Sequence, residues 1–262
     1  MAEFGIPLVL TSPPVTGQKV KDAQTLLHGA NTFKENYHPG AIDSVMGPQT
    51  AGAIYRAKWF LGYPRRHVNR SMGETLYDYL NGKKKLPVLN RWRRKVRLKR
   101  AKKIETGKIK AVEAAIADAA IPVKEYPPGS NLQKYGAWYG YNGVAWCCIA
   151  ISYWLNHAGN KNWVAGSFAS YVGTVVNAAQ TGSHHLALTS SPQKGDLAIY
   201  NHVDHIEFFV EWIDQANGVF KAVGGNTSAS NGSYNNGGEV AVNTRYVHDA
   251  GFPVTNFVRV GA

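Results

Sequence analysis

Hydrophobic positions in the first 82 residues recur with the period of amphipathic helices. After a first helix that contains Val20 to Leu27, a second helix is predicted over residues 50–61. It ends at Gly62-Tyr63-Pro64, since Gly and Pro stop helices. A shorter helix is predicted over residues 71–79. This part of the chain is therefore expected to be a small all-α module. One face of its first helix carries Val20, Ala23, Leu26 and Leu27.

Beyond residue 104 the pattern again begins with helices. Apolar residues outline a helix over residues 109–119, before Pro122, and a more apolar one over residues 144–158. Cys147 is expected on the buried face of the second helix, near its start, whereas Cys148 lies on another side. That buried face carries Cys147, Ala150, Ile151, Trp154 and Ala158.

From residue 195 onward the hydrophobic period changes to two, the period of β-strands. Asn217-Gly218 is a strong hairpin signal, and the Ser/Asn/Gly-rich residues 229–238 predict a mobile loop. Helices followed by strands indicate an α+β fold with an antiparallel sheet. The predicted strands are residues 197–200, 205–212, 219–223, 240–246 and 253–260.

Positive charge is concentrated in one segment. Of the 29 Lys and Arg residues, 12 fall within residues 83–103, and the other 17 are balanced by 17 Asp and Glu. We therefore divide the chain into residues 1–82, a basic linker at 83–104 and a second domain at 105–262. The charge favours nonspecific contact with a polyanion through 83–103 over sequence-specific recognition of DNA. The plainest interpretation of the segment is a solvated linker helix, in which Leu89, Trp92 and Val96 form one narrow face that could dock.

The composition excludes several classes of protein. With 44% hydrophobic and 18% charged residues among 262, the chain is not of the disordered class. Its longest uncharged apolar run, residues 144–155, is too short for an integral membrane segment. The N-terminus lacks the basic leader of a signal peptide. Cys147 and Cys148 are adjacent and are expected to be free thiols, since neighbouring Cα atoms, about 3.8 Å apart, are closer than an unstrained disulfide prefers.

A cysteine at the start of a helix and a histidine at the start of a strand form the layout that a thiol hydrolase requires. Cys147 and His205 hold these positions, and the backbone N–H of Cys147 is the natural oxyanion donor. Asn226, at the end of the next strand, is predicted to orient the imidazole ring. Glu207 and Glu211 share the strand face of His205, so either is an alternative group to orient the ring, but we interpret them as surface carboxylates.

Other polar side chains offer competing interpretations. Cys148 is interpreted as an inert packing thiol. His202 and Asp204 join His205 in a His-Val-Asp-His run, which is a poor metal site without a CxxC or HExxH partner. His184-His185 is expected to be exposed in a loop. The side chain that assists the oxyanion donor stays open among Tyr139, Tyr141 and Asn142.

Two stretches of the first module carry a family motif. Residues 17–27 read GQKVKDAQTLL, and residues 40–53 read GAIDSVMGPQTAGA. Together they resemble the peptidoglycan-binding type 1 module, although Ser44 stands where that family has glycine. The resemblance implies a peptidoglycan ligand, with Asp43, Gly47 and Thr50 as binding residues. An alternative of equal weight is that these three residues shape a turn and cap the following helix.

An ordered set of motifs covers nearly all of residues 110–262: residues 125–131, Trp146-Cys147, residues 192–196, His205 and residues 224–228. The set resembles the cysteine, histidine-dependent amidohydrolase/peptidase (CHAP) family, a papain-like fold that cleaves amide bonds in peptidoglycan. The resemblance implies catalysis by Cys147, His205 and Asn226. Many relatives carry a glutamate where this chain has Gly224, and some have an acidic calcium loop that residues 139–143 lack. We therefore expect no metal and no cofactor.

A wall-binding module joined to a wall-cleaving domain resembles a phage endolysin. The resemblance implies a peptidoglycan amidase or endopeptidase, which we expect to be monomeric and to stay in the host cytoplasm until it is released to the cell wall. Two alternatives remain. One is a non-catalytic wall-binding or virion structural protein with a decayed site, favoured by Gly224, and the other is a nucleic-acid-binding protein that uses residues 83–103.

Overall fold

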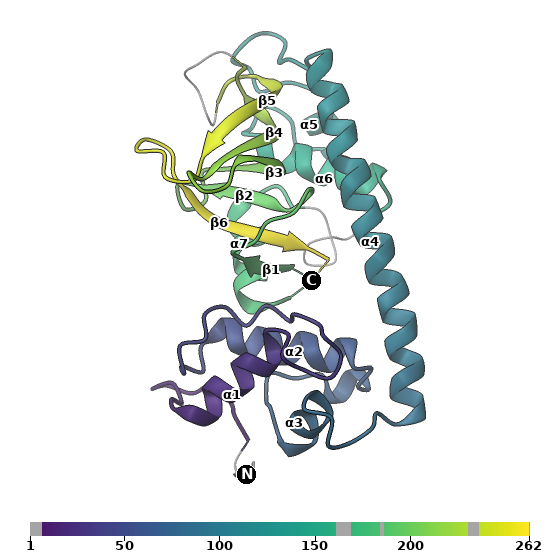
Figure 1. Cartoon of the computed structure of the whole chain (residues 1–262). Coiled ribbons are helices and arrows are strands. Elements are labelled where there is room, and N and C mark those ends of the chain that lie inside the picture. Colours follow the sequence, from purple (N-terminus) through teal and green to yellow (C-terminus); the bar gives the residue numbers. More distant parts are fainter. Residues whose placement is uncertain (1–6, 161–168, 184–185, 230–235, 262) are drawn as a thin grey trace. The chain divides into compact units, whose positions relative to one another are not determined.

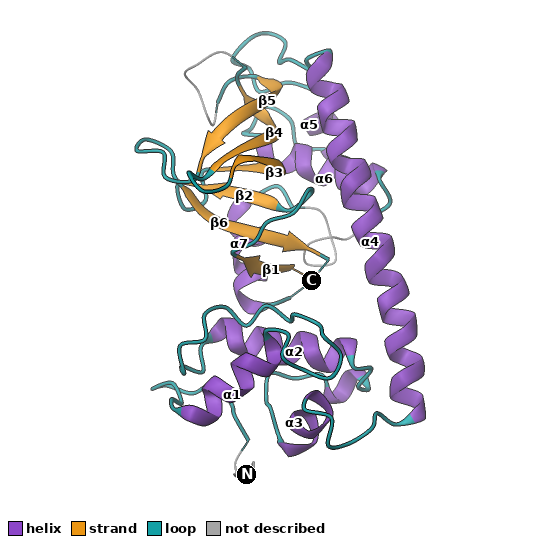
Figure 2. Cartoon of the chain, in the orientation of Figure 1, coloured by secondary structure: helices purple, strands orange, loops and turns teal. Residues whose placement is uncertain are grey.

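The computed structural model describes residues 7–160, 169–183, 186–229 and 236–261. Within them the chain has an α+β fold with seven α-helices and a six-stranded antiparallel sheet, as the hydrophobic pattern predicted (Figure 1; Figure 2). The chain divides into two compact units. The described residues of 1–103 and 180–188 belong to the first unit, and those of 104–179 and 189–261 belong to the second.

The first unit contains the three short helices predicted there. They are α1 (Gln18–Leu27), α2 (Pro48–Phe60) and α3 (Glu74–Leu80), with a 3-10 turn at Arg65–His67 between the last two. Pro48 is the first residue of α2, where its fixed φ suits a helix start. Gly62, with φ 78°, follows the end of α2 in the left-handed conformation that a helix terminus favours.

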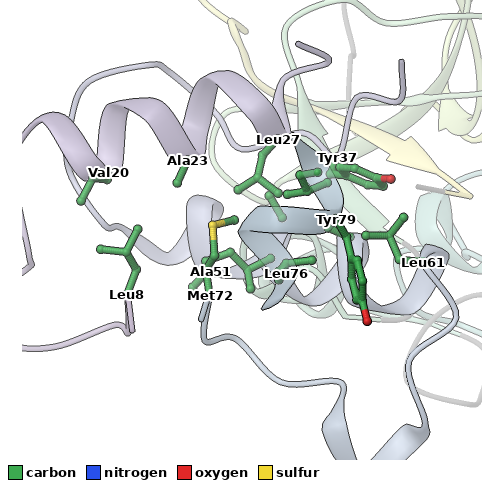
Figure 3. Close-up of a cluster of buried hydrophobic side chains, with 14 of the residues drawn as sticks. Leu8, Val20, Ala23, Leu27, Tyr37, Ala51, Leu61, Met72, Leu76 and Tyr79 are labelled. Atoms are coloured by element: carbon green, nitrogen blue, oxygen red, sulfur yellow. The ribbon is translucent and has the colours of Figure 1, made fainter. Parts of the chain in front are cut away.

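The apolar faces of these three helices meet in one core, and most of its side chains are fully buried (Figure 3). An isolated bridge between Leu8 and Met72 brings the segment before α1 and the segment before α3 onto the same core. The helical period of the apolar residues therefore explains this packing. The buried members that come from helices include Val20, Ala23 and Leu27 of α1, Ile54 and Ala57 of α2, and Leu76 and Leu80 of α3.

Most of the basic segment lies in one long helix, α4 (Val88–Ala120), which also includes the predicted helix at residues 109–119. Leu89, Trp92 and Val96, the face that could dock, are exposed, as expected for a solvated helix. The first part of α4, which belongs to the first unit, contacts the rest of that unit through guanidinium groups. Arg94 pairs with Glu35 at 2.6 Å, and the guanidinium of Arg97 lies 3.9 Å from the ring centre of Trp59.

The sheet has the strand order β1-β6-β2-β3-β4-β5. Five of its strands were predicted, and β1 was missed. In β2 and β3 the register pairs Tyr200 with His205 and Ile199 with Ile206, so residues 201–204 form the turn between the two strands. The strands are β1 (Leu186–Thr189), β2 (Leu197–Tyr200), β3 (His205–Asp214), β4 (Val219–Thr227), β5 (Glu239–Tyr246) and β6 (Val254–Val260).

Helix α6 (Cys147–His157) packs against β3 and β4, and α5 (Lys134–Tyr139) packs against α6. Helix α7 (Val172–Thr181) completes the described helices. The second part of α4 is held by a buried ion pair, in which Lys108 Nζ lies 2.9 Å from Asp196 Oδ1 at the start of β2. Residues 230–235 of the predicted mobile loop lie outside the described residues. The sheet and α6 thus form the frame on which the predicted catalytic residues lie.

Candidate active site

Cys147 is the first residue of α6 and is almost fully buried. The preceding Trp146 fixes this helix start, since its indole N–H donates to Glu125 at 2.9 Å and its ring stacks on Tyr135. A Cβ at Gly225 would lie 2.3 Å from the Trp146 ring, so only glycine permits this close approach. The sequence pattern placed Cys147 at the buried start of its helix, and the structure confirms that placement.

His205 is the first residue of β3, and its side chain is fully buried. Burial lowers the pKa of the His205 imidazole, but interactions with the Cys147 thiol and the Glu207 carboxylate outweigh it and raise the pKa to about 9. The thiol and the imidazole therefore influence each other electrostatically, although neither ring nitrogen of His205 makes a hydrogen bond within the described residues. The fold brings together two residues that are 58 positions apart in the sequence.

Glu207 supplies a buried carboxylate to this pair. Its Oε1 lies 3.4 Å from His205 Nε2, and its side chain has no solvent exposure. Arg245 of β5 donates from Nε to Oε2 at 2.8 Å and from Nη2 to Oε1 at 2.6 Å, and the Tyr200 hydroxyl donates to Oε2 at 2.8 Å. Burial raises the pKa of Glu207, but Arg245 and His205 lower it by a larger amount. The net effect is a pKa well below the usual value of a glutamate.

The interpretation of Glu207 as a surface carboxylate is therefore wrong. Gly224 of β4 makes room for it, since a Cβ at that position would lie 2.6 Å from Glu207 Cγ. Glu211, further along β3, is exposed and forms an ion pair with Lys221 at 2.8 Å. Strand periodicity placed both carboxylates on the face of His205, but the register of β3 against β4 shifts between Phe209 and Glu211, and only Glu207 is buried.

Asn226 lies near the end of β4, as predicted, and is fully buried. Its φ of 59° is in the left-handed region, which is uncommon for a residue other than glycine. The polar atom that lies close to His205 Nε2 is Oε1 of Glu207, at 3.4 Å, and that nitrogen makes no hydrogen bond to Asn226. The orienting role of Asn226 therefore stays a prediction.

The candidates for assisting the oxyanion donor have different surroundings. Tyr141 is exposed, and Tyr139 packs edge-on against Trp138. Asn142 accepts through Oδ1 from the backbone N–H of Gln133 at 3.2 Å. The choice among Tyr139, Tyr141 and Asn142 stays open.

The remaining predicted polar residues are separated from the site or from each other. Cys148 is fully buried, and burial raises the pKa of its thiol well above the usual value, as suits a packing residue. His202 and Asp204 are exposed in the turn, whereas His205 is buried, so the three side chains do not converge. No group of three or more metal-ligating side chains occurs in the part of the chain that the structure describes. His184-His185 lies outside the described residues.

In the first unit, Asp43 and Thr50 are joined by the side chain of Gln24. Gln24 Nε2 donates to Asp43 Oδ1 at 2.8 Å and to Thr50 Oγ1 at 3.0 Å, and its Oε1 accepts from the Ser44 N–H. Gly47 precedes the first residue of α2. These contacts support the turn-shaping part of the structural alternative, because Thr50 is buried and Asp43 also accepts from the Val45 N–H at 2.9 Å, but no side chain of the described residues caps the start of α2. Peptidoglycan binding by Asp43, Gly47 and Thr50 stays a prediction.

Comparison with models of known protein families, with curated proteins and with solved structures found no match. In the described part of the chain, no helix combines the length and the apolar character that are needed to cross a bilayer. The functional assignment therefore depends on the chemistry of the site itself.

Proposed function

We propose that this protein is a peptidoglycan hydrolase that cleaves an amide bond of the bacterial cell wall with Cys147 as its nucleophile. The observation that carries the proposal is the buried series Cys147, His205, Glu207 and Arg245. A nucleophile, a base and a group that orients the base are the three parts of a thiol hydrolase. The indole of Trp146 and the Gly225 backbone hold the nucleophile at the start of α6.

Each residue has a defined step. The sulfur of Cys147, in the thiolate form in which a cysteine is a nucleophile, attacks the carbonyl carbon of the amide. The backbone N–H of Cys147 stabilises the oxyanion, and His205 gives its proton to the leaving amine. His205 then takes a proton from water, whose oxygen attacks the thioester and releases the carboxylic acid and the Cys147 thiolate, with His205 again protonated. Glu207, held by Arg245, orients the imidazole through Nε2, which leaves Nδ1 for the thiol.

Peptidoglycan is the proposed substrate because two parts of the chain resemble families that act on it. The first resembles a wall-binding module and the second a wall-cleaving domain, the combination of a phage endolysin. Such a module raises the local concentration of the catalytic unit at its polymer. The proposal places the enzyme in the host cytoplasm before its release to the wall. Glu207 fills the space beside Gly224, so the missing glutamate at position 224 does not favour a decayed site.

The proposal is tested by the products released from purified cell walls. Amide cleavage releases free amino groups, whereas cleavage of the glycan strands releases reducing ends. We expect the wild-type protein to release amino groups without added metal, and Cys147→Ala to release none. Reducing ends without new amino groups, or equal release by Cys147→Ala, would contradict the proposed reaction.

A further inference from the structure

One face of α4 in the first unit presents large apolar side chains to solvent. Leu89, Trp92 and Val96 are 63%, 64% and 50% exposed. Their spacing of i, i+3 and i+7 places them in one stripe along the helix. The face that contacts the rest of the unit is a different one, since it carries Arg94 and Arg97.

Basic side chains border this stripe on both sides. At 100° per residue, Lys95 and Lys99 fall on one side of it, and Arg93 and Arg100 fall on the other. Lys95, Lys99 and Arg100 are exposed, and Arg93 is half-buried. No acidic residue occurs in the sequence from 83 to 104. The α4 face, defined as the stripe of Leu89, Trp92 and Val96 with these four cations, is therefore both apolar and strongly positive.

We propose that the α4 face binds the surface of an anionic lipid bilayer. A soluble polyanion or a nucleic acid requires only the charge, and it leaves the apolar stripe in water. A bilayer surface offers a partner to both kinds of side chain, because lipid phosphates attract the cations while the interface takes up the apolar groups. Tryptophan is enriched at this boundary, and Trp92 is the second of the three residues along the stripe.

This contact is peripheral and uses no residue of the candidate active site. It therefore goes beyond the proposed hydrolase activity, and a Cys147→Ala protein is expected to bind lipid as the wild type does. The test is co-sedimentation of the full chain with vesicles of phosphatidylcholine and phosphatidylglycerol, compared with vesicles of phosphatidylcholine alone. We expect binding to the anionic vesicles only, and weaker binding as the salt concentration rises.

Two variants separate the stripe from the charge. Trp92→Ala is expected to weaken binding to anionic vesicles about tenfold, the ratio that corresponds to one large apolar side chain. The double variant Lys95→Gln with Lys99→Gln is expected to bind more weakly and with less dependence on salt. Ile121→Ser is the matched control, since Ile121 is 85% exposed but lies outside the stripe, and it should bind as the wild type does. Circular dichroism checks that each variant is folded.

Three results would overturn the proposal. One is equal binding to uncharged vesicles, and another is unchanged binding of the Trp92→Ala variant. The third is a concentration-dependent dimer without lipid that Trp92→Ala abolishes, which would make a second copy the occupant of the α4 face. If the wild-type protein cleaves cell walls but does not bind the anionic vesicles, the lipid-binding proposal is refuted while the proposed hydrolase function stands.

Discussion

A Cβ atom at position 224 would lie 2.6 Å from Cγ of Glu207. The glycine on β4 therefore leaves space for a carboxylate that comes from the strand of His205 itself. The resemblance of the sequence motifs implies a glutamate at position 224. We propose that the pair is an exchange, in which Glu207 supplies the carboxylate from the neighbouring strand.

The exchange predicts that position 224 tolerates no side chain while Glu207 is present. Gly224→Ala is expected to lower the free energy of unfolding by about 1–3 kcal/mol, since an extra methyl overpacks a buried site, and to slow wall cleavage by displacing Glu207. Urea unfolding and the rate of wall clearing measure the two effects. If the exchange is correct, Glu207→Gly combined with Gly224→Glu cleaves faster than either single variant; a double variant no faster than the singles would contradict it.

The pH dependence of cleavage reports on the interaction between Glu207 and His205. The His205 pKa is raised to about 9, so its imidazolium is present below that pH and is lost as the pH rises through it. Cleavage should therefore decline above pH 9, because His205 has no proton for the leaving amine. Glu207→Gln removes a group that raises this pKa, and the alkaline decline should move to lower pH.

The matched control for this shift is Glu211→Gln. Glu211 is on the same strand but is exposed and paired with Lys221. Its substitution should leave the alkaline limb of the rate profile unchanged. A Glu207→Gln protein whose profile matches the wild type would show that Glu207 does not act on His205.

Removing one partner of the buried ion pair between Arg245 and Glu207 should destabilise the protein strongly. Arg245→Ala leaves the Glu207 carboxylate buried without its cation, which typically costs about 3–5 kcal/mol of unfolding free energy. Lys221→Ala removes an exposed pair on the same sheet and should change stability little. Chemical denaturation of both variants makes the comparison, and equal effects would contradict the buried role of Arg245.

The close approach of Gly225 to Trp146 should position the nucleophile. Gly225→Ala puts a methyl 2.3 Å from the Trp146 ring and must displace the start of α6, so cleavage should fall severalfold. Gly251→Ala is the control, since its nearest neighbour is an Asp249 oxygen at 3.7 Å, an ordinary contact. Initial clearing rates compare the two variants, and a Gly225→Ala protein of wild-type activity would show that this contact does not position Cys147.

Local sequence patterns predicted much of this fold. The period-two pattern predicted five strands, and β2 runs from Leu197 to Tyr200 as expected. Helical spacing placed Cys147 at the buried start of its helix. These predictions succeed because each depends on residues that are close together in the chain.

Features that depend on distant partners were missed. Glu207 and Glu211 look alike in the sequence, and what buries Glu207 is Arg245, 38 residues further on, together with Gly224. The stripe of Leu89, Trp92 and Val96 has the spacing of a docking face, yet α4 docks through Arg94 and Arg97. Guanidinium contacts with a carboxylate and an aromatic ring leave no hydrophobic pattern in the sequence, so nothing local indicated that face.

The most direct test of the central claim is the clearing of a suspension of purified cell walls by wild type, Cys147→Ala and Cys148→Ala, without added metal. Both thiols are buried and adjacent, but the candidate mechanism uses only Cys147. We predict that Cys147→Ala is inactive and that Cys148→Ala clears the walls. Equal clearing by all three proteins would contradict a thiol mechanism, and clearing by Cys147→Ala but not by Cys148→Ala would contradict the choice of nucleophile.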